Sequence, residues 1–345
     1  MSPAALKAAL VEEARARGFE LCRVAHAGTP PHAAEFREWL ADGAHGSMAW
    51  LEKNAGRRTN PEAVLPGARS VIVLGMNYWQ RDPPRRAGAG KFARYAWGDD
   101  YHDVIEPRLR ELDAFLQKHD GRQRSYVDTG PVLERDFAAL AGLGWQGKST
   151  MLIHPKLGTW LFLATILTTL ELPPDEPMRD HCGKCTRCIT ACPTGAITAP
   201  QRVDARLCVS YLTIENKGPI PPALRTAVGD RVYGCDDCLD ACPWNRFAAE
   251  SREARFAARK FIGMPLRELL ALDEESFRTL FKNSPVKRIK RRGLLRNVCV
   301  ALGNTGTVAD IPALEAASRD PEPLIAEHAA WALAQIRGRS VATAR

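Results

Sequence analysis

Eight of the ten cysteines lie within one stretch of 61 residues, and this crowding constrains the fold more than any other feature of the sequence. The first run has the spacing C-x2-C-x2-C-x3-C-P, with which bacterial iron–sulfur proteins bind four-iron clusters. The second run, C-x2-C-x3-C-P, has only three cysteines because Val232 stands where its leading one belongs, and Cys208 can complete it. Eight thiols therefore predict two [4Fe–4S] clusters.

The pairing of thiols follows from a crossed rule, in which the cysteine before proline binds the cluster of the other run. The first cluster would use Cys182, Cys185, Cys188 and Cys242, and the second Cys192, Cys208, Cys235 and Cys238. Two four-cysteine zinc sites are the alternative, but they do not require the repeated C-x3-C-P ending. A radical-SAM site is excluded because no C-x3-C-x2-C triplet is present. Cys22 and Cys299 are interpreted as small buried hydrophobic residues.

The first 20 residues lack the apolar core of a secretory signal, so we expect a cytoplasmic protein in which disulfides are rare. The longest apolar run, residues 160–170, is too short to cross a bilayer as a helix. We expect no membrane association and a monomer. The net charge of +8 permits a polyanionic partner without requiring one.

The length of 345 residues predicts two or three domains. Strand character and helical spacing alternate before residue 173, which indicates an α/β domain. Pro173, Pro174 and Pro177 then interrupt regular structure before the cysteines. The predicted strands are 19–25, 70–76, 125–129, 150–154 and 160–170. The predicted helices are one at the start of the chain that ends at Gly18, then 103–119 and 131–142. The predicted domains are 1–172, 173–250 with a ferredoxin-like two-cluster arrangement, and 251–345.

The C-terminal part contains three predicted helices, 289–302, 310–318 and 323–336, in a stretch that resembles a HEAT-type helical repeat. Residues 285–297 carry six basic side chains and no acidic one. A solvated helix face is one interpretation of this charge run. Contacts with RNA phosphates, which fix register without reading bases, are the other.

Residues 142–149 match the phosphate-binding motif G-x4-G-K-S letter for letter. That motif requires a strand before it and a helix after it, so that backbone N–H groups converge on phosphate. Here the predicted order is helix and then strand. We therefore reject nucleotide hydrolysis and interpret the glycines as allowing close approach of a bulky ligand.

Long phrases of the chain resemble the epoxyqueuosine reductase family. They are ARYAWGDDYHDVI (93–105), TGPVLERDFAALAGLGWQGKSTMLIHPKLGTW (129–160), the two cysteine runs, CVSYLTIENKG (208–218) and the helical tail. The resemblance covers most of the chain, whereas a generic ferredoxin shares only the cysteines.

The resemblance implies reduction of epoxyqueuosine to queuosine at the wobble base of tRNA, the last step of queuosine biosynthesis. It implies cobalamin in an N-terminal domain like that of reductive dehalogenases, electrons passing through both clusters, and an external low-potential electron donor. No D-x-H-x-x-G motif is present, because Asp100-Tyr101-His102 lacks the required glycine. The resemblance therefore implies a cobalamin without a histidine ligand from the protein.

The resemblance also implies roles for single residues. Asp136 matches the acid that protonates the departing oxygen; the alternative is a helix-surface carboxylate paired with Arg135. Tyr101 and His102 are assigned to the corrin and substrate pocket, and the alternative is a strand-to-helix junction with Asp103 as N-cap. Further expected cofactor contacts are Arg57 (or Arg58), Asp136 itself, Ser149, Thr150, His154 and Ser210, and expected tRNA contacts are Lys217, Lys287, Arg288, Lys290, Arg291 and Arg292.

Two other functions remain open at this stage. A reductive dehalogenase acting on a small organohalide would use the same cofactors, although such enzymes usually carry an export signal. An electron-transfer or RNA-binding protein without catalysis is the other.

Overall fold

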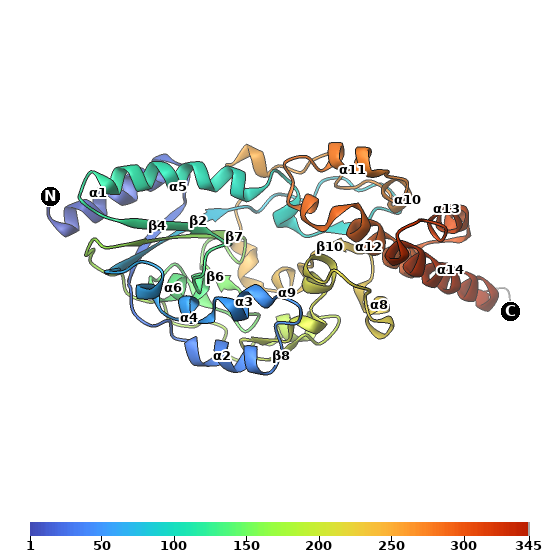
Figure 1. Ribbon diagram of the computed structural model, residues 1–345, viewed down its shortest axis with the longest axis horizontal. Helices are drawn as coiled ribbons and strands as arrows, with labels where there is room; N and C mark the ends of the chain where they lie inside the picture. Colours follow the sequence, from blue (N-terminus) through green and yellow to red (C-terminus); the bar gives the residue numbers. More distant parts are fainter. Residues whose placement is uncertain (344–345) are drawn as a thin grey trace.

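The computed structural model describes residues 1–343. The molecule is elongated, with an N-terminal sheet at one end and helix α14 (Pro323–Thr343) at the other (Figure 1). Within the described residues, none of the helices combines the length and the apolar composition that a membrane span requires.

The N-terminal sheet has four strands in the order β1-β2-β7-β4, and every neighbouring pair is antiparallel. Alternating strands and helices most often give a parallel sheet, so this arrangement differs from the usual outcome of such a sequence. Four of the predicted strands are present. The fifth, 150–154, is reduced to a two-residue strand after a tight turn in which Thr150 N–H donates to Gly147 C=O. The strands are β1 (Leu21–His26), β2 (Ser70–Asn77), β4 (Gln123–Val127), β7 (Leu161–Thr168), and the small pair β5 (Trp145–Gln146) with β6 (Leu152–Ile153).

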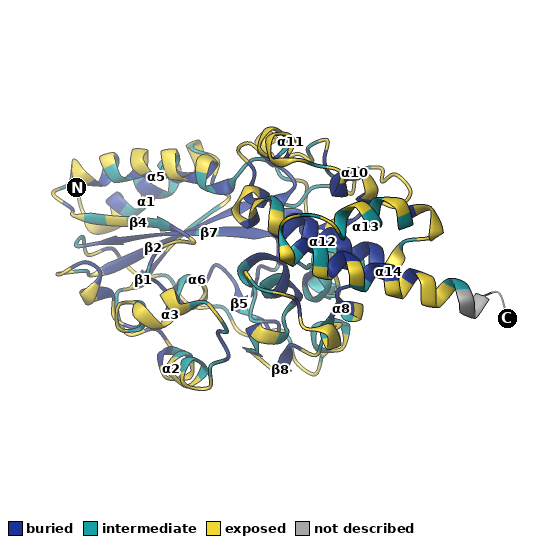
Figure 2. Cartoon of the chain, turned by 45° about the vertical axis from the view of Figure 1, so that its right-hand side comes forward, coloured by how far each residue is buried: buried dark blue, intermediate teal, exposed yellow. Residues whose placement is uncertain are grey.

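Helices cover both faces of the sheet (Figures 1 and 2). Strand β2 is buried along its whole length, and its side chains alternate between two cores. Ile72, Leu74 and Met76 pack with α1 (Pro3–Ala16) and α5 (Tyr101–Gln117). Val71 and Val73 pack with α6 (Glu134–Leu140) on the opposite face. A large cleft opens on this second face.

The C-terminal part is helical, as predicted. Its helices are α10 (Leu266–Leu270), α11 (Glu274–Leu280), α12 (Lys290–Thr305), α13 (Ile311–Ala317) and α14. Helices α12 and α14 pack closely at Gly303. A Cβ atom at this position would lie 2.3 Å from the Trp331 ring, so the contact requires glycine. One large core joins these helices. The likeness to a HEAT repeat stays a prediction.

The middle of the chain joins the two ends. It contains α7 (Arg187–Ala191), β8 (Ile197–Ala199), β9 (Arg202–Val203), α8 (Pro222–Val228), β10 (Arg231–Tyr233) and α9 (Asp237–Asp240). Strand β10 pairs in parallel with β3 (Lys91–Phe92), and Phe92 and Trp97 belong to the core of the C-terminal helices. The segment around residues 91–97, which the sequence assigns to the first domain, thus packs against the C-terminal helices. Domain boundaries drawn along the sequence could not show this contact.

Candidate active site

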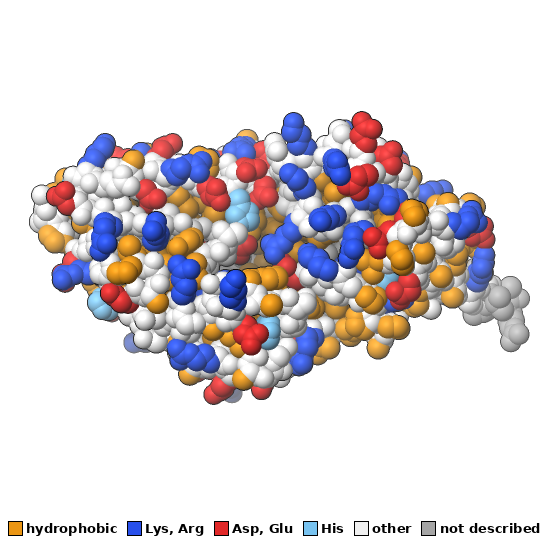
Figure 3. Space-filling model, viewed as in Figure 1, with side chains coloured by type: hydrophobic (Ala, Val, Ile, Leu, Met, Phe, Trp, Pro, Cys, Tyr) orange, Lys and Arg blue, Asp and Glu red, His pale blue; other side chains and the backbone are white. Residues whose placement is uncertain are grey.

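A cleft of about 1160 Å³ opens on the α6 side of the sheet. Its walls are α2 (Ala33–Ala41), α3 (Ala49–Lys53), α4 (Ala55–Arg58), the loop after β4, the start of α6 and the segment 199–203. Figure 3 shows a hollow near the middle of one face, with Lys and Arg side chains around it. The volume exceeds the usual 300–1,000 Å³ of small-molecule pockets, so the cleft can accept a bulky ligand.

An acidic pair lies in the cleft where β4 ends. The backbone N–H of Asp128 donates to Oε1 of Glu134 at 3.1 Å, and the Tyr101 hydroxyl donates to Oδ2 of Asp128 at 2.6 Å. Burial, followed by the charge of Asp128, raises the pKa of Glu134 to about 8. Burial lowers the pKa of the nearby Arg58, whose guanidinium donates to Val132 C=O. The Glu134 carboxyl can therefore hold a proton at neutral pH beside the charged Arg58 guanidinium.

Asp136 also lines the cleft, but both of its oxygens already have partners. Oδ2 accepts from the backbone N–H of His32 at 2.9 Å, and Oδ1 lies 2.9 Å from His32 Nδ1. The carboxylate is buried on helix α6, so it is not the exposed helix-surface group of the alternative interpretation. Its contacts attach the start of α2 to the wall of the cleft.

Sequence reasoning missed Asp128, Glu134 and His32. Asp128 stands in the cleft with φ 58°, a conformation that non-glycine residues adopt rarely. The phrase VDTGP carries no pattern that marks its aspartate as reactive. Only the fold shows that the end of β4 opens into the cleft.

The expected cofactor contacts divide into two groups. Arg57 and Thr150 line the cleft, and the hydroxyl of Tyr101 reaches Asp128 in its wall. Helix α5 begins at Tyr101 with Asp100, not Asp103, as its N-cap, because the Asp100 side chain accepts from His102 N–H. His102 stacks on Tyr101 with ring centroids 4.2 Å apart, and its Nε2 is buried without a protein partner.

The other three expected contacts lie outside the cleft lining, and two of them, His154 and Ser210, have partners within the protein. Ser149 is buried in the glycine loop. His154 accepts the backbone N–H groups of Lys156 and Leu157 on Nδ1, and burial lowers its pKa to about 4. Ser210 Oγ lies 3.5 Å from Cys235 C=O, beside a cysteine run. None of these positions tests the predicted cofactor contacts, which stay predictions.

The glycine loop has the geometry that the sequence order predicts, a helix before it and a strand after it. Gly142 has φ 69° and no room for a side chain, since a Cβ atom would lie 2.2 Å from Glu176 C=O. The loop ends in the β5–β6 hairpin, and Gln146 and Thr150 face the cleft. The motif is therefore a turn at the cleft wall and not a phosphate-binding loop.

The eight clustered thiols come together in two groups. Burial and then the neighbouring Cys182, Cys188 and Cys185 raise the pKa of Cys242. Burial and then Cys235, Cys208 and Cys192 raise the pKa of Cys238. These are the two sets expected from the crossed pairing. Across the described residues, no three His, Cys, Asp or Glu side chains form a compact group for a single metal ion. Four thiols around a multi-iron cluster bind different irons, so this donor set fits two clusters.

The cleft fits a cobalamin by its volume and by one unsatisfied polar group. Oε1 of Gln146 is buried in the cleft wall without a hydrogen-bond partner in the protein. The corrin periphery carries amide groups that can donate to such an oxygen. Together with Arg57 and Thr150, Gln146 is a residue that could hold the group.

The basic stretch before and within α12 divides by burial. Lys287, Arg288, Lys290 and Arg292 are exposed, and Arg288 also lines the cleft, where it pairs with Glu215 at 2.7 Å. Arg291 pairs with Asp320 at 2.8 Å, and Lys217 donates to Ile214 C=O. The sixth cation, Arg296, is buried and donates to the carbonyls of Leu212, Asn216 and Gly218. The charge run therefore mixes surface cations with a structural arginine.

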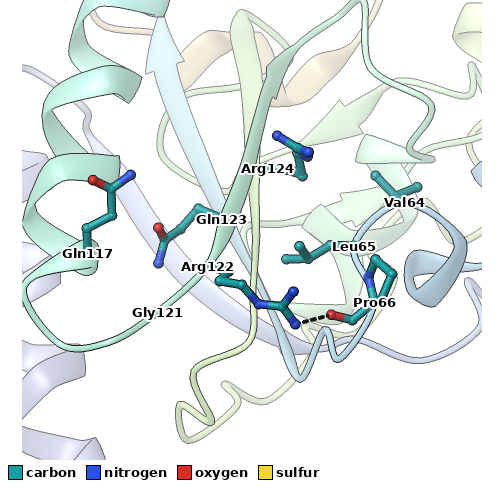
Figure 4. Close-up of a pocket in the computed structure, with 8 residues that line it drawn as sticks. All are labelled: Val64, Leu65, Pro66, Gln117, Gly121, Arg122, Gln123 and Arg124. Carbon is teal, nitrogen blue, oxygen red and sulfur yellow. Dashed lines mark hydrogen bonds between the residues drawn. The ribbon is translucent and has the colours of Figure 1, made fainter.

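A second hollow, of about 450 Å³, lies at the opposite end of β4 from Asp128 (Figure 4). Arg122 donates there to Pro66 C=O at 2.8 Å. It contains no acidic residue and no predicted site residue. We therefore place the candidate active site in the larger cleft.

Two groups of four thiols, together with a cleft that contains a proton-holding acid pair, define the class of the protein: an iron–sulfur oxidoreductase. Residues 181–245 match the family model of the 4Fe-4S double cluster binding domain, and residues 58–129 match that of epoxyqueuosine reductase QueG, DUF1730. The epoxyqueuosine reductase of Xanthomonas campestris pv. campestris is 43% identical over 335 residues, covering 93% of this chain and 94% of the relative. That of Escherichia coli K12 is 40% identical, covering 92% and 86%.

Solved structures agree with these relatives. A crystal structure of epoxyqueuosine reductase with an epoxyqueuosine-modified tRNA-Tyr stem loop has a TM-score of 0.90 at 33% identity, covering 96% of this chain and 90% of that one. A Bacillus subtilis epoxyqueuosine reductase, shown with an aspartate-bearing catalytic loop swung out of the active site, has a TM-score of 0.88 at 31% identity, covering 96% and 90%. The chain belongs to the epoxyqueuosine reductase family. The family expected from the sequence is thereby confirmed, as is a double-cluster domain, whereas the likeness to reductive dehalogenases stays a prediction.

Proposed function

We propose that this protein reduces epoxyqueuosine to queuosine at the wobble position of tRNA, the last step of queuosine biosynthesis, in the cytoplasm. The observation that carries the proposal is the cleft with its acid pair, in a chain whose thiols also gather in two groups of four. The stem-loop complex of the relative with a TM-score of 0.90 supports tRNA as the substrate. Conversion of the epoxide to the alkene consumes two electrons and two protons and releases water.

We assign the proton delivered to the departing oxygen to Asp128 and not to Asp136. Asp128 is on a loop, is exposed to the cleft and is held by Tyr101. The relative from Bacillus subtilis carries its catalytic aspartate on a loop as well, whereas Asp136 is in a helix. Glu134, protonated up to a pH of about 8, can keep a proton beside Asp128. Asp136 positions His32 and the start of α2.

The clusters and the corrin would carry the electrons from the external donor to the epoxide. The two thiol groups would hold two [4Fe–4S] clusters, and Arg57, Gln146 and Thr150 would hold cobalamin. When bound, cobalamin supplies a low-potential cobalt centre that can take up electrons from the clusters and pass them to the epoxide. The target base must leave its stack to enter the cleft, and the exposed cations at 287–292 can bind the phosphates around it.

The function is tested by incubating the anaerobically loaded protein and a low-potential reductant with either of two substrates. One is an anticodon stem loop that contains epoxyqueuosine, and the other is a small organohalide. Nucleoside analysis should show queuosine, and no halide should be released. Halide release without queuosine would establish the dehalogenase alternative, and inertness toward both, with clusters and corrin bound, would leave a non-catalytic protein.

A further inference from the structure

The two cysteine runs differ in the charge of the residues around them. Residues 178–189, around the first three cysteines, contain Arg179, Lys184 and Arg187 against the single acid Asp180. Cys242, which joins that group, is followed by Arg246 without an acid up to residue 249. By contrast, residues 234–241, around Cys235 and Cys238 of the other group, contain three aspartates and no cation. The first group is thus the cationic one.

These cations are exposed and without ion pairs in the described residues, whereas two of the three aspartates of the other run, Asp236 and Asp237, are engaged in the fold. Arg179, Lys184 and Arg187 are exposed, and none of the three takes part in an ion pair in the described part of the chain. Asp236 accepts from the backbone N–H of Arg94, and Asp237 pairs with Arg231. The charge at the first group therefore faces solvent.

Aromatic side chains lead from the first group to the surface. His181, next to Cys182 in the sequence, and Trp244, two residues after Cys242, both pack against Trp145, at centroid distances of 5.1 and 4.9 Å. Trp244 packs on Phe247 at 5.9 Å, and Phe247 is 44% exposed with the Arg246 guanidinium 4.5 Å from its ring. An exposed aromatic ring with an arginine beside it is typical of a protein-binding surface.

We propose that this surface, formed by Arg179, Lys184, Arg187, Arg246 and Phe247, is the docking site for a small acidic protein that carries one electron at low potential. The proposal rests on the proposed function, which requires an external donor. Each encounter would oxidise the carrier by one electron and reduce the cluster bound by Cys182, Cys185, Cys188 and Cys242 by one. Two encounters supply the two electrons of one epoxide reduction.

The position of the cations favours a protein carrier over RNA. Lys184 lies between two cluster cysteines and Arg187 adjoins a third, so a partner bound to them approaches the cluster itself. Electron transfer requires that approach, whereas binding of tRNA phosphates does not. Complementary charge between partners raises the association rate and makes it depend on salt.

The test uses the loaded protein and a plant-type [2Fe–2S] ferredoxin as the acidic, low-potential probe. The variant is Lys184→Glu/Arg187→Glu. The matched control, Arg15→Glu/Lys118→Glu, reverses two exposed cations on the α1 and α5 side of the sheet. The first readout is the affinity for oxidised ferredoxin at several salt concentrations. The second is the rate of cluster reduction by reduced ferredoxin, compared with photoreduced deazaflavin, a small reductant that needs no docking surface.

We expect the variant to bind ferredoxin about tenfold more weakly and to be reduced about tenfold more slowly at low salt, with the difference vanishing at high salt. The control and the deazaflavin rate should match the wild type. If the double variant loses iron, Lys184→Ala and Arg187→Ala each carry the same test. Unchanged ferredoxin affinity overturns the proposal, as does a loss of stem-loop affinity alone, which would make the surface part of the RNA interface. Deazaflavin-driven conversion of epoxyqueuosine tests the proposed function independently of any carrier.

Discussion

The Tyr101 hydroxyl donates a hydrogen bond to Oδ2 of Asp128 across 2.6 Å, and this contact joins the first turn of α5 to the loop after β4. Tyr101 is buried and stacks on Phe162 with ring centroids 4.5 Å apart, so the donor is held rigidly. The backbone of Asp128 has a φ of 58°, a conformation that costs free energy for a residue other than glycine. An aspartate with this unusual backbone conformation, whose carboxylate is held in a cleft by the Tyr101 hydroxyl, is arranged for a reaction more than for stability.

Glu134 should set the alkaline limb of the pH profile. Its pKa is raised from 4.5 to about 8, so the proton is present at neutral pH and lost as the pH rises through 8. Above pH 8 the deprotonated Glu134 adds a negative charge beside Asp128, and the cleft no longer holds this proton. We expect kcat/KM of the wild type to fall above pH 8 and that of Glu134→Gln, which mimics the protonated form, to stay flat there.

The same substitution should raise the melting temperature relative to the wild type at alkaline pH and leave it nearly unchanged at acidic pH. Because the folded protein binds this proton more tightly than the unfolded chain, the stabilisation is complete below pH 4.5 and is lost as the pH rises toward 8. Glu134→Gln should therefore melt higher than the wild type at pH 8.5 and close to it at pH 5. Parallel melting curves at both pH values would contradict the raised pKa.

Cys208 should be indispensable for one cluster and irrelevant to the other. Cys208→Ala should leave about four of the eight irons that two clusters hold, because its group loses one of four thiolates. Iron analysis and electron paramagnetic resonance of the reduced protein check this. Cys299→Ala, a buried cysteine outside both groups, should retain all eight.

The exposed lysines of the tail should contribute to tRNA affinity, whereas the half-buried Arg291, which is paired with Asp320, should not. Lys287→Gln/Lys290→Gln should weaken stem-loop binding and reduce the slope of log K against log salt by about one to two. Arg291→Gln, in the same segment but paired with Asp320, should leave that slope unchanged. Equal slopes for the double variant and the wild type would remove this stretch from the RNA interface.

Arg296 should act on stability. Its replacement by Met leaves the carbonyls of Leu212, Asn216 and Gly218 without their donors inside the core. The expected cost is about 3 kcal/mol, seen as a melting temperature lower by roughly 5 °C. Arg278→Met, on the exposed face of α11, should change the melting temperature little.

The sequence was informative where spacing alone carries the chemistry. The cysteine runs predict the two thiol groups, because ligand geometry is written into intervals of two and three residues. The order of helix and strand around Gly142 and Gly147 was also sufficient to reject the phosphate-binding loop. Strand alternation located the sheet but not its antiparallel pairing, which depends on how distant segments meet.

Sequence alone could not choose between Asp136, which the family resemblance suggested, and Asp128, which we propose as the acid, because the two carboxylates are only eight residues apart. Asp136 stands in an apolar helix, which suggests a raised pKa, but the fold directs both of its oxygens to His32. Asp128 lies in an unremarkable turn, and only the folded chain brings Tyr101 and Glu134 to it. Long-range contacts decide such a site.

The most direct measurement is a single-turnover nucleoside assay on loaded, pre-reduced protein with epoxyqueuosine-containing tRNA. It compares the wild type with Asp128→Asn and Asp136→Asn after iron and corrinoid contents have been matched. The wild type should form queuosine, and Asp128→Asn should be slower by about 10²- to 10⁴-fold, the usual contribution of a general acid. Asp136→Asn should retain a much larger part of the rate. Queuosine formation by Asp128→Asn at the wild-type rate would contradict the account.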